Sequence, residues 1–510
     1  MLLHEILSAA ARDHADETAL ICPADEVRLT FGQLSAASTA LAAAVDARVS
    51  PGGRVAIIAH NRAEYVVACY GVPQAGRVLV PLNPRLHAKE WAEQLRRSGT
   101  ELVLAERAFA DLLAAEWAGP VVVLGEDGTW DGILAEGRSL RAPAPPASDR
   151  DLAWLLFTSG STGRPTGVRL THRSLTAAMR TTLARRPVHD DTVFLTPFPL
   201  CHIAAAYQIP MHHVRARPVV VARKYDPEQF LAAVRAHCVT STSLAPTMID
   251  ALLDRPDAAD LRGVLRSIGY GASPITPDLL RRTADILGCA LGQGYGSTEL
   301  SGNAVFLTPE DHRPELLSAA GRPGPGVELR IVDDAWADVP DGALGEIAVQ
   351  AEQVCDGYWD DPEATAAAIQ GGWFRTGDLG RLDADGYLYI VDRKKDIVIT
   401  GGENVSAREV EAVLRTHPAI RDVAVIGQPD ARWGETVCAV VVATTDPTTN
   451  APLHDPREVQ AELVSLCRSH LAGFKVPRTV HFVAELPTTA SGKVSKPALR
   501  EQFATQHAGN

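Results

Sequence analysis

Apolar runs typical of buried β-strands alternate with stretches of helical periodicity over most of the chain. The strand-like runs cover residues 54–60, 78–82, 101–105, 120–125, 218–222 and 239–246. Between them, residues 88–98 and 227–237 repeat apolar positions with the period of a helix. Strands that alternate with helices predict an α/β protein with large, parallel-rich sheets.

The pattern changes after Gly321. Short strand-like runs at residues 327–333, 345–350 and 386–392 are separated by Gly, Pro and Asp turns. This spacing predicts an antiparallel, β-barrel-like subdomain that ends near Asp392.

The rest of the chain predicts a small α+β unit. Ser406 and Glu409 form a capping box, in which the serine accepts from an N3 amide and the glutamate reaches back. Further strands are predicted at residues 422–427, 436–444 and 478–486, and a helix at 456–471. The polar link 392–396 separates two apolar runs, so it is expected to be an exposed domain connection.

Composition narrows the range of functions. At about 150 residues per domain, 510 residues predict two to four domains. Hydrophobic residues make up 46% and charged residues 22%, as in globular proteins. The net charge of −13 disfavours nucleic acid and anionic membranes as partners, because an acidic surface repels phosphate.

Cysteine usage and the N-terminal segment bear on the compartment. The eight cysteines are scattered without a C-x-x-C pair, which favours reduced thiols over disulfides or zinc. Residues 1–17 resemble an amphipathic helix rather than a signal peptide, and no apolar run approaches the roughly 18 residues of a membrane span. We therefore expect a soluble, cytoplasmic protein.

One loop points to a phosphate ligand. The apolar run 153–157 leads into Thr-Ser-Gly-Ser-Thr-Gly-Arg-Pro-Thr-Gly at residues 158–167. Its amides and hydroxyls suit phosphate oxygens. It matches neither the Walker A nor the G-x-G-x-x-G pattern. A plain flexible Gly/Ser loop remains the alternative on composition alone.

Four later segments add candidate chemistry. In residues 292–299, Tyr295 is suited to stacking on a base, Thr298 to a phosphate and Glu299 to Mg²⁺. Asp378, after a Thr-Gly turn, is suited to ribose hydroxyls, and Lys493 lies on a turn of small residues. The remaining segment comprises the charged link 392–396 and Gly-Gly-Glu-Asn at 401–404.

In this order, the segments resemble the adenylate-forming superfamily of acyl-CoA synthetases, adenylation domains and luciferases. The closest motifs are those of stand-alone fatty-acyl or aryl acyl-CoA ligases, and the resemblance runs from residues 29–35 to Lys493. It implies an N-terminal AMP-binding domain at 1–392, a hinge at 393–396 with Lys395 as hinge residue, and a mobile C-terminal lid at 397–510.

The resemblance also implies a set of ATP-site residues. Lys493, Glu299, Thr298 and His202 would be catalytic, with Glu299 and Thr298 on the metal. The nucleotide would be bound by Thr158, Ser159, Gly160, Ser161, Thr162, Gly163, Gly271, Ala272, Ser273, Gly294, Tyr295, Gly296, Ser297, Thr298, Asp378, Arg393 and Lys493.

Two further groups of residues concern the acid and its acceptor. Small residues around a histidine suggest room for an aromatic or medium-chain acid; the acyl-pocket candidates are His202, Ala204, Ala205, Tyr270, Gly302 and Asn303. The face that receives CoA would include Gly401, Gly402 and Glu403. Trp433 and Phe474 either stack on the CoA adenine or pack the core of the small domain.

The chain departs from the family at one position. The family loop usually ends in Pro-Lys-Gly, whereas this chain has Thr166 between Pro165 and Gly167. A missing cation near the pyrophosphate weakens charge neutralisation. Either Thr166 is tolerated, because Lys493, Mg²⁺ and the loop amides suffice, or the enzyme is slow or specialised.

The resemblance implies an AMP-forming acid–thiol ligase. ATP activates a carboxylic acid as acyl-AMP with release of pyrophosphate, and the acyl group passes to a thiol, CoA, so that ATP, Mg²⁺ and CoA are the expected cofactors. Transfer to an amine, another nitrogen nucleophile or a carrier protein is the alternative, and a degenerate nucleotide-binding regulator is a third interpretation. A homodimer stays open.

Overall fold

The computed structural model describes residues 1–125, 128–144, 146, 148–159, 165–271, 275–400, 403–430, 433–445, 455–489 and 493–504. Two compact units divide the chain. The first comprises Met1–Arg330, Ala348–Thr376 and Asp383–Tyr389, and the second comprises Ile331–Ile347, Gly377–Leu382 and Ile390–Asn510. The domain boundaries at 392 and 397 stay a prediction.

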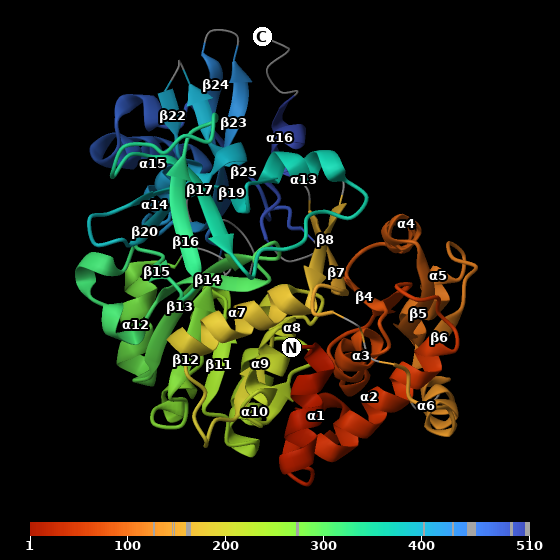
Figure 1. Cartoon of the computed structure of the whole chain (residues 1–510). Coiled ribbons are helices and arrows are strands. Elements are labelled where there is room, and N and C mark those ends of the chain that lie inside the picture. Colours follow the sequence, from red (N-terminus) through yellow and green to blue (C-terminus); the bar gives the residue numbers. More distant parts are fainter. Residues whose placement is uncertain are drawn as a thin grey trace. The chain divides into compact units, whose positions relative to one another are not determined.

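The larger sheet of the first unit has nine strands, with its central strands parallel and its edges antiparallel. In spatial order these are β15 (Arg322–Pro323), β14 (Gly302–Leu307), β13 (Ala290–Ser297), β12 (Ser267–Gly271), β11 (Ser241–Leu244), β9 (Phe194–Thr196), β10 (Val219–Val221), β1 (Thr18–Cys22) and β2 (Val27–Thr30). Figure 1 labels strands β11 to β15 of this sheet. The parallel strands are largely buried, as sheets covered on both faces require.

A six-stranded sheet carries the described ends of the predicted phosphate loop. Its order is β6 (Val121–Leu124), β5 (Thr100–Glu106), β3 (Arg54–Ile58), β4 (Val78–Leu82), β7 (Leu152–Ser159) and β8 (Pro165–Thr171). All neighbours are parallel except β7 and β8, which form an antiparallel pair. The expected parallel-rich α/β architecture is confirmed.

Helices connect these strands and close the cores of the first unit. They are α1 (Leu3–Asp13), α2 (Phe31–Asp46), α3 (Ala63–Gln74), α4 (Ala88–Ser98), α5 (Arg107–Leu113), α6 (Trp130–Ser139), α7 (His172–Arg185), α8 (Ile203–Ala206), α9 (Gln208–His213), α10 (Pro227–Ala236), α11 (Pro246–Leu253), α12 (Pro277–Leu287) and α13 (Pro362–Ala368). The expected amphipathic N-terminal helix is α1, which buries Leu3, Ile6 and Leu7. Within the described ranges, no helix has the length and apolar character that a membrane crossing needs.

The short strands after Gly321 form a five-stranded sheet. It consists of β16 (Val327–Val332), β17 (Gly345–Ala351), β19 (Trp373–Leu382) and β18 (Ile369–Gln370), with β20 (Leu388–Arg393) paired to β19. The expected subdomain of short strands is therefore present.

The C-terminal part of the second unit is an α+β layer. Its sheet contains β22 (Glu403–Val405), β21 (Val398–Thr400), β24 (Gly434–Ala443) and β23 (Ile420–Asp430), with β25 (Thr479–Phe482) on β24, and its helices are α14 (Ala407–Leu414), α15 (Pro456–His470) and α16 (Lys496–Ala504). Val410, Leu414 and Leu463 pack against strand residues such as Val425 and Val441 in its core. The expected small α+β unit is confirmed.

Two local expectations need correction. Ser406 accepts from the amide of Glu409 at 3.3 Å, but the Glu409 carboxylate is bound to Lys475 at 2.7 Å instead of reaching back. Asp392, expected in an exposed link, is only 1% exposed. It is buried because the Ser406 hydroxyl and the amide of Arg408 donate to it, at 2.9 and 3.1 Å.

Candidate active site

The β7–β8 pair presents the predicted phosphate loop. Thr158 lies opposite Thr166 and Ser159 opposite Pro165, and the Thr158 hydroxyl donates to the Thr166 carbonyl at 3.4 Å. Gly160, Ser161, Thr162 and Gly163 lie outside the described residues. The two strands thus bring both ends of the predicted loop together.

The glycines of the predicted adenine segment are required by backbone contact. Gly271 on β12 lies opposite Gly294 on β13, and a Cβ at Gly271 would be 2.4 Å from the Gly294 carbonyl oxygen. A Cβ at Gly296 would be 1.9 Å from the carbonyl oxygen of Gly302. No side chain fits at either position without backbone movement. Ala272 and Ser273 lie outside the described residues.

Glu299 is held by the segment 355–359. Its backbone carbonyl accepts from the amide of Cys355 at 2.8 Å, and its carboxylate accepts from the Tyr358 hydroxyl at 3.3 Å. Tyr358 also bridges to Val168 on β8. Burial, followed by the Glu299 charge, raises the pKa of Tyr358, so the phenol stays a donor. Tyr358 therefore connects Glu299 to the phosphate-loop hairpin.

The residues at this position fit Mg²⁺. A carboxylate and a hydroxyl, on Glu299 and Thr298, supply the oxygen ligands that Mg²⁺ prefers. Among the described residues there is no cluster of three or more His, Cys, Asp or Glu that would hold a metal. A single carboxylate is adequate, because Mg²⁺ in phosphate-handling enzymes takes its remaining ligands from phosphates and water.

The predicted ribose pair and the predicted catalytic lysine come together in the second unit. Arg393 Nε lies 3.1 Å from Asp378 Oδ1, and Asp378 is only 6% exposed. The Thr489 amide donates to the Lys493 carbonyl at 2.7 Å. Desolvation and then Arg393 lower the pKa of Lys493, while Asp378 opposes the shift. The lysine therefore lies within electrostatic range of both members of the pair.

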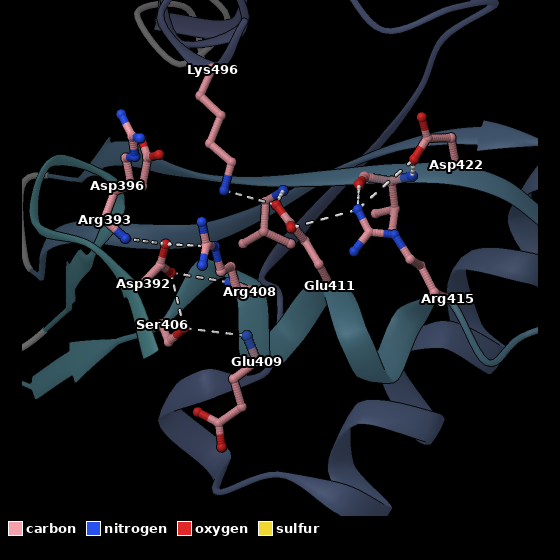
Figure 2. Close-up of polar contacts among 12 residues, drawn as sticks. Asp392, Arg393, Asp396, Ser406, Arg408, Glu409, Glu411, Arg415, Asp422 and Lys496 are labelled. Atoms are coloured by element: carbon pink, nitrogen blue, oxygen red, sulfur yellow. Dashed lines mark hydrogen bonds and ion pairs between the residues drawn. The ribbon is translucent and has the colours of Figure 1, made fainter. Parts of the chain in front are cut away.

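Polar contacts hold Asp392, which precedes Arg393 of the predicted ribose pair, and Glu411 on α14 (Figure 2). Asp392 lies beside Ser406 and Arg408 at the N-terminus of α14, where a helix favours negative charge. From α16, Lys496 reaches Glu411 at 2.8 Å. The predicted hinge residue, Lys395, lies in the turn Lys394–Asp396, and its side chain is outside the described residues.

His202 is the N-cap residue of α8 and is partly buried. The chain before it is fixed by Asn61, whose carboxamide accepts from the Leu200 amide at 2.7 Å and donates to the Phe198 carbonyl at 2.8 Å. Ala204 keeps some exposure, whereas Ala205 is fully buried. Asn61 thus positions the segment that carries His202.

The other acyl-pocket candidates divide between two faces of the sheet. Asn303 donates to the Tyr207 hydroxyl at 2.9 Å, and Gly302 lies against the Tyr207 ring. Tyr270 instead belongs to the core cluster with Leu280, on the face of β12 opposite to its neighbours Gly269 and Gly271. Its hydroxyl contacts His312 at 3.0 Å. The structure therefore does not bring Tyr270 together with Asn303 and Gly302.

The acceptor candidates are only partly described. Gly401 and Gly402 lie outside the described residues, and Glu403 is exposed at the start of β22. Arg478 lies over the partly buried ring of Trp433, 4.7 Å from its centroid. Phe474 is 41% exposed, so the alternative in which it packs the core is wrong.

Sequence reasoning missed the residues that position the candidates. Asn61 comes shortly after strand β3, and side chains at the carboxyl ends of parallel strands are where α/β sheets place functional groups. That position was a usable signal. The sequence contains no comparable signal for Tyr358, because its contact with Glu299 joins residues 59 positions apart in the chain.

The first unit has parallel α/β sheets, a hydroxyl-rich hairpin and a carboxylate suited to Mg²⁺. The second unit has a lysine within electrostatic range of an Asp–Arg pair. These are the features expected of a nucleotide-dependent enzyme of the adenylate-forming class. Family comparison agrees: residues 7–359 match the AMP-binding enzyme family, and residues 409–493 match the AMP-binding enzyme C-terminal domain. The chain belongs to this family, which confirms the resemblance stated above.

Named relatives include both CoA ligases and an amide synthetase. Feruloyl-CoA synthase from Amycolatopsis sp. is 37% identical over 93% of this chain and 94% of its own. The structure of o-succinylbenzoate CoA synthetase from Bacillus subtilis, in complex with its acyl-adenylate intermediate, matches with a TM-score of 0.86 and 30% identity over 98% of this chain and 97% of its own. The amide bond synthetase McbA from Marinactinospora thermotolerans also has a TM-score of 0.86, with 32% identity over 99% of this chain and 100% of its own.

Proposed function

We propose that the protein is an AMP-forming acid–thiol ligase, which activates a carboxylic acid with ATP and transfers the acyl group to CoA. The observation that carries the proposal is the grouping of Lys493 with the Asp378–Arg393 pair in a member of the AMP-binding family. This grouping supplies a ribose acceptor, a guanidinium and a second cation in one place. The 37% identity to a feruloyl-CoA synthase favours CoA as the acceptor.

In the first step, a carboxylate oxygen of the acid attacks the α-phosphorus of ATP. The bond from phosphorus to the bridging oxygen breaks, and pyrophosphate leaves. Because a carboxylate is already a nucleophile, no general base is needed, and the barrier comes from bringing anions together. Lys493 would neutralise charge between carboxylate and α-phosphate, and Asp378 would accept from the ribose hydroxyls.

Glu299 and Thr298 would hold Mg²⁺, which supplies charge neutralisation on the phosphates when bound. The hydroxyl of Tyr358 fixes one oxygen of Glu299, so the carboxylate has a defined orientation. The hairpin that begins at Thr158 would place its amides on the phosphates.

In the second step, the thiol sulfur of CoA attacks the acyl carbon of the mixed anhydride, and AMP leaves with the bonding electron pair. The acceptor face would include Glu403, Trp433 and Phe474. The exposed ring of Phe474 is accessible for stacking on a purine. We extend the proposal to the domain division at 393–396, about which residues 397–510 would move between the two steps.

The experiment is acid-dependent pyrophosphate release from ATP·Mg²⁺ by the full chain, measured with a panel of aromatic and aliphatic acids, with and without CoA. The proposal predicts pyrophosphate release with a subset of acids and formation of an acyl-CoA thioester, detected by mass, when CoA is present. Absence of acid-dependent pyrophosphate release would overturn adenylation and favour the degenerate nucleotide-binding regulator.

An amide-forming synthetase is the second candidate, favoured by the TM-score of 0.86 to McbA. Its first step uses the same residues, so only the acceptor separates the two functions. If amines supplied without CoA yield amides while CoA yields no thioester, the acceptor assignment changes and the adenylation stays.

The proposed partners are the acid, ATP and the acceptor. A homodimer stays a prediction, which sedimentation measurements test.

A further inference from the structure

Among the described residues of the first unit, none provides a counter-charge for the guanidinium of Arg186. It directly follows α7, whose last residue is Arg185, and its side chain is partly buried. No described residue offers it a hydrogen bond or an ion pair. Desolvation lowers the pKa of its guanidinium, although an arginine stays protonated at neutral pH. A guanidinium taken from water without an anion is costly, so this position needs an explanation.

Two glycines make room for this guanidinium. Gly269 on β12 and Gly292 on β13 lie opposite each other, and a Cβ at Gly269 would be only 2.0 Å from Arg186 Nη1. A Cβ at Gly292 would be 3.9 Å from the Arg186 side chain. The guanidinium therefore lies over the sheet where β12 and β13 carry no side chains.

The charged and titratable groups that face Arg186 offer no negative charge. The Arg186 charge opposes the rise that burial causes in the pKa of Tyr207, so the phenol lies within electrostatic range. Burial, with a smaller effect of Arg186, lowers the pKa of His212 to about 3, so the imidazole is neutral at pH 7. A phenol, a neutral imidazole and two glycines leave the guanidinium uncompensated.

The position also belongs to the acyl-pocket side of the sheet. Tyr207 lies against Gly302 and accepts from Asn303, two of the residues expected to line that pocket. Gly269 and Gly271 share one face of β12, and Gly271 is the neighbour of Gly294 in the nucleotide segment. Arg186 therefore lies on the face of the sheet that carries the nucleotide segment. It faces Gly269 and Gly292, which precede Gly271 and Gly294 in their strands.

We propose that Arg186 recognises an oxygen anion on the acid substrate, at the end remote from the reacting carboxylate, so that the preferred substrates are acids with a second carboxylate. The inference rests on the proposed function and assigns a substrate class to it. A guanidinium binds a carboxylate through two parallel hydrogen bonds. Gly269 and Gly292 leave the space over the strands that such a group requires.

The test uses matched acids that differ only at the remote end. Aliphatic monoacids are compared with dicarboxylic acids of equal chain length, and benzoic acid is compared with its para-carboxyl and para-hydroxyl derivatives, by pyrophosphate release. The wild-type enzyme is expected to have the higher kcat/KM for the diacid of each pair. Arg186→Met should raise KM for that diacid by about 10- to 100-fold, the range for a hydrogen bond to a charged group.

Arg186→Met should change KM for the unsubstituted acids by less than roughly 3-fold, since they lack the group that Arg186 binds. Arg186→Lys keeps the positive charge but loses the two parallel N–H donors of the guanidinium. Its KM for the diacid should lie between those of the wild type and Arg186→Met. The matched control is Arg180→Met. Arg180 lies on α7, but it forms an ion pair with Glu352. This variant should leave the kcat/KM ratio of the two acids in each pair unchanged. Thermal unfolding of each variant checks the fold.

If Arg186→Met lowers kcat/KM equally for both acids of each pair, the inference is overturned and Arg186 has a structural role. A wild-type preference for unsubstituted acids would also overturn it, even if Arg186→Met fails to fold. A preference for the para-hydroxyl over the para-carboxyl acid would assign the site to a phenol and overturn the dicarboxylate class. In each of these outcomes, acid-dependent pyrophosphate release would still support the proposed function. If no acid causes pyrophosphate release, both the proposed function and this inference are overturned.

Discussion

The hydroxyl of Tyr358 donates to the carboxylate of Glu299 across 3.3 Å, and the backbone of the same tyrosine bridges to Val168 on the phosphate-loop hairpin. One residue thus links two segments of the proposed ATP site that lie far apart in the sequence. The carboxylate that would bind Mg²⁺ and the hairpin that would bind the phosphates are positioned relative to each other by this contact.

Replacing Tyr358 by phenylalanine should weaken the response to Mg²⁺ while leaving the fold intact. The loss of one hydrogen bond of about 1 kcal/mol should raise the Mg²⁺ concentration for half-maximal pyrophosphate release by roughly 5-fold. Titration of Mg²⁺ at fixed ATP measures it. Tyr225→Phe, which removes a hydroxyl that donates to the Met248 carbonyl, is the matched control and should not shift the curve. An unchanged Mg²⁺ response would contradict the positioning role.

Replacing Lys493 by alanine should abolish adenylation but spare thioester formation from supplied acyl-AMP. The lysine lies within electrostatic range of Asp378 and Arg393, where it would neutralise charge only in the first step. A loss of at least about 100-fold in acid-dependent ATP–pyrophosphate exchange is expected, the scale for removal of one preorganised electrostatic group. Lys475→Ala, which removes the partner of Glu409, is the control lysine. Full exchange activity in Lys493→Ala would refute the assignment.

The strand and helix pattern was largely predictable from the sequence, and the contacts between segments were not. The helix expected at residues 88–98 is α4 (Ala88–Ser98), and the strand expected at 78–82 is β4 (Val78–Leu82), because both rest on local periodicity. Asp392 shows the opposite case. Its charge indicated exposure, but its burial depends on Ser406 and Arg408, which only the folded chain brings to it.

The candidate site divides in the same way. Glycines such as Gly271 and Gly296 are identified by their order in motifs, and the structure adds the reason, a backbone approach that excludes a Cβ. Arg186 belongs to no motif, since an arginine at the end of a helix is ordinary in a sequence. Its lack of a counter-charge is visible only when the neighbours from three other elements are known.

Stability of the first unit should fall as the pH decreases below about 6.5. Burial lowers the pKa of His172 and of His212 to about 3, and that of His213 to about 4, so these residues are neutral when folded. The unfolded chain takes up protons below its pKa of about 6.5, whereas the folded chain does not. Stability is therefore fully present above pH 6.5 and is lost as the pH falls toward the folded values.

Urea unfolding at pH 7, 6 and 5 measures this dependence. Each histidine contributes up to about 1.4 kcal/mol per pH unit within the window. His172→Gln, which removes a side chain that accepts from the Leu3 amide, should lower stability at pH 7 and reduce the slope by about one proton. A slope at pH 5 to 6 that is unchanged in this variant would contradict burial of a neutral His172.

Breaking the Lys496–Glu411 pair should lower both the stability of the second unit and the rate of adenylation. The two groups lie 2.8 Å apart with side chains 14% and 7% exposed, and Glu411 also accepts from the Val425 amide. Removing the ammonium leaves the buried Glu411 carboxylate with Arg415, 3.6 Å away, as its remaining cation, so the cost is at most about 3 kcal/mol. Because Lys496 opens α16 three residues after Lys493, its contact with Glu411 also restrains the backbone that carries Lys493.

Lys496→Met is therefore expected to reduce acid-dependent ATP–pyrophosphate exchange more than transfer from supplied acyl-AMP, since only the first step uses Lys493. The double variant Lys496→Met/Glu411→Leu removes both charges and should recover much of the stability, because an apolar pair needs no compensation. If positioning of Lys493 depends on the ion pair, exchange stays low in the double variant although stability returns. Recovery of both together would show that Lys496 acts through stability alone.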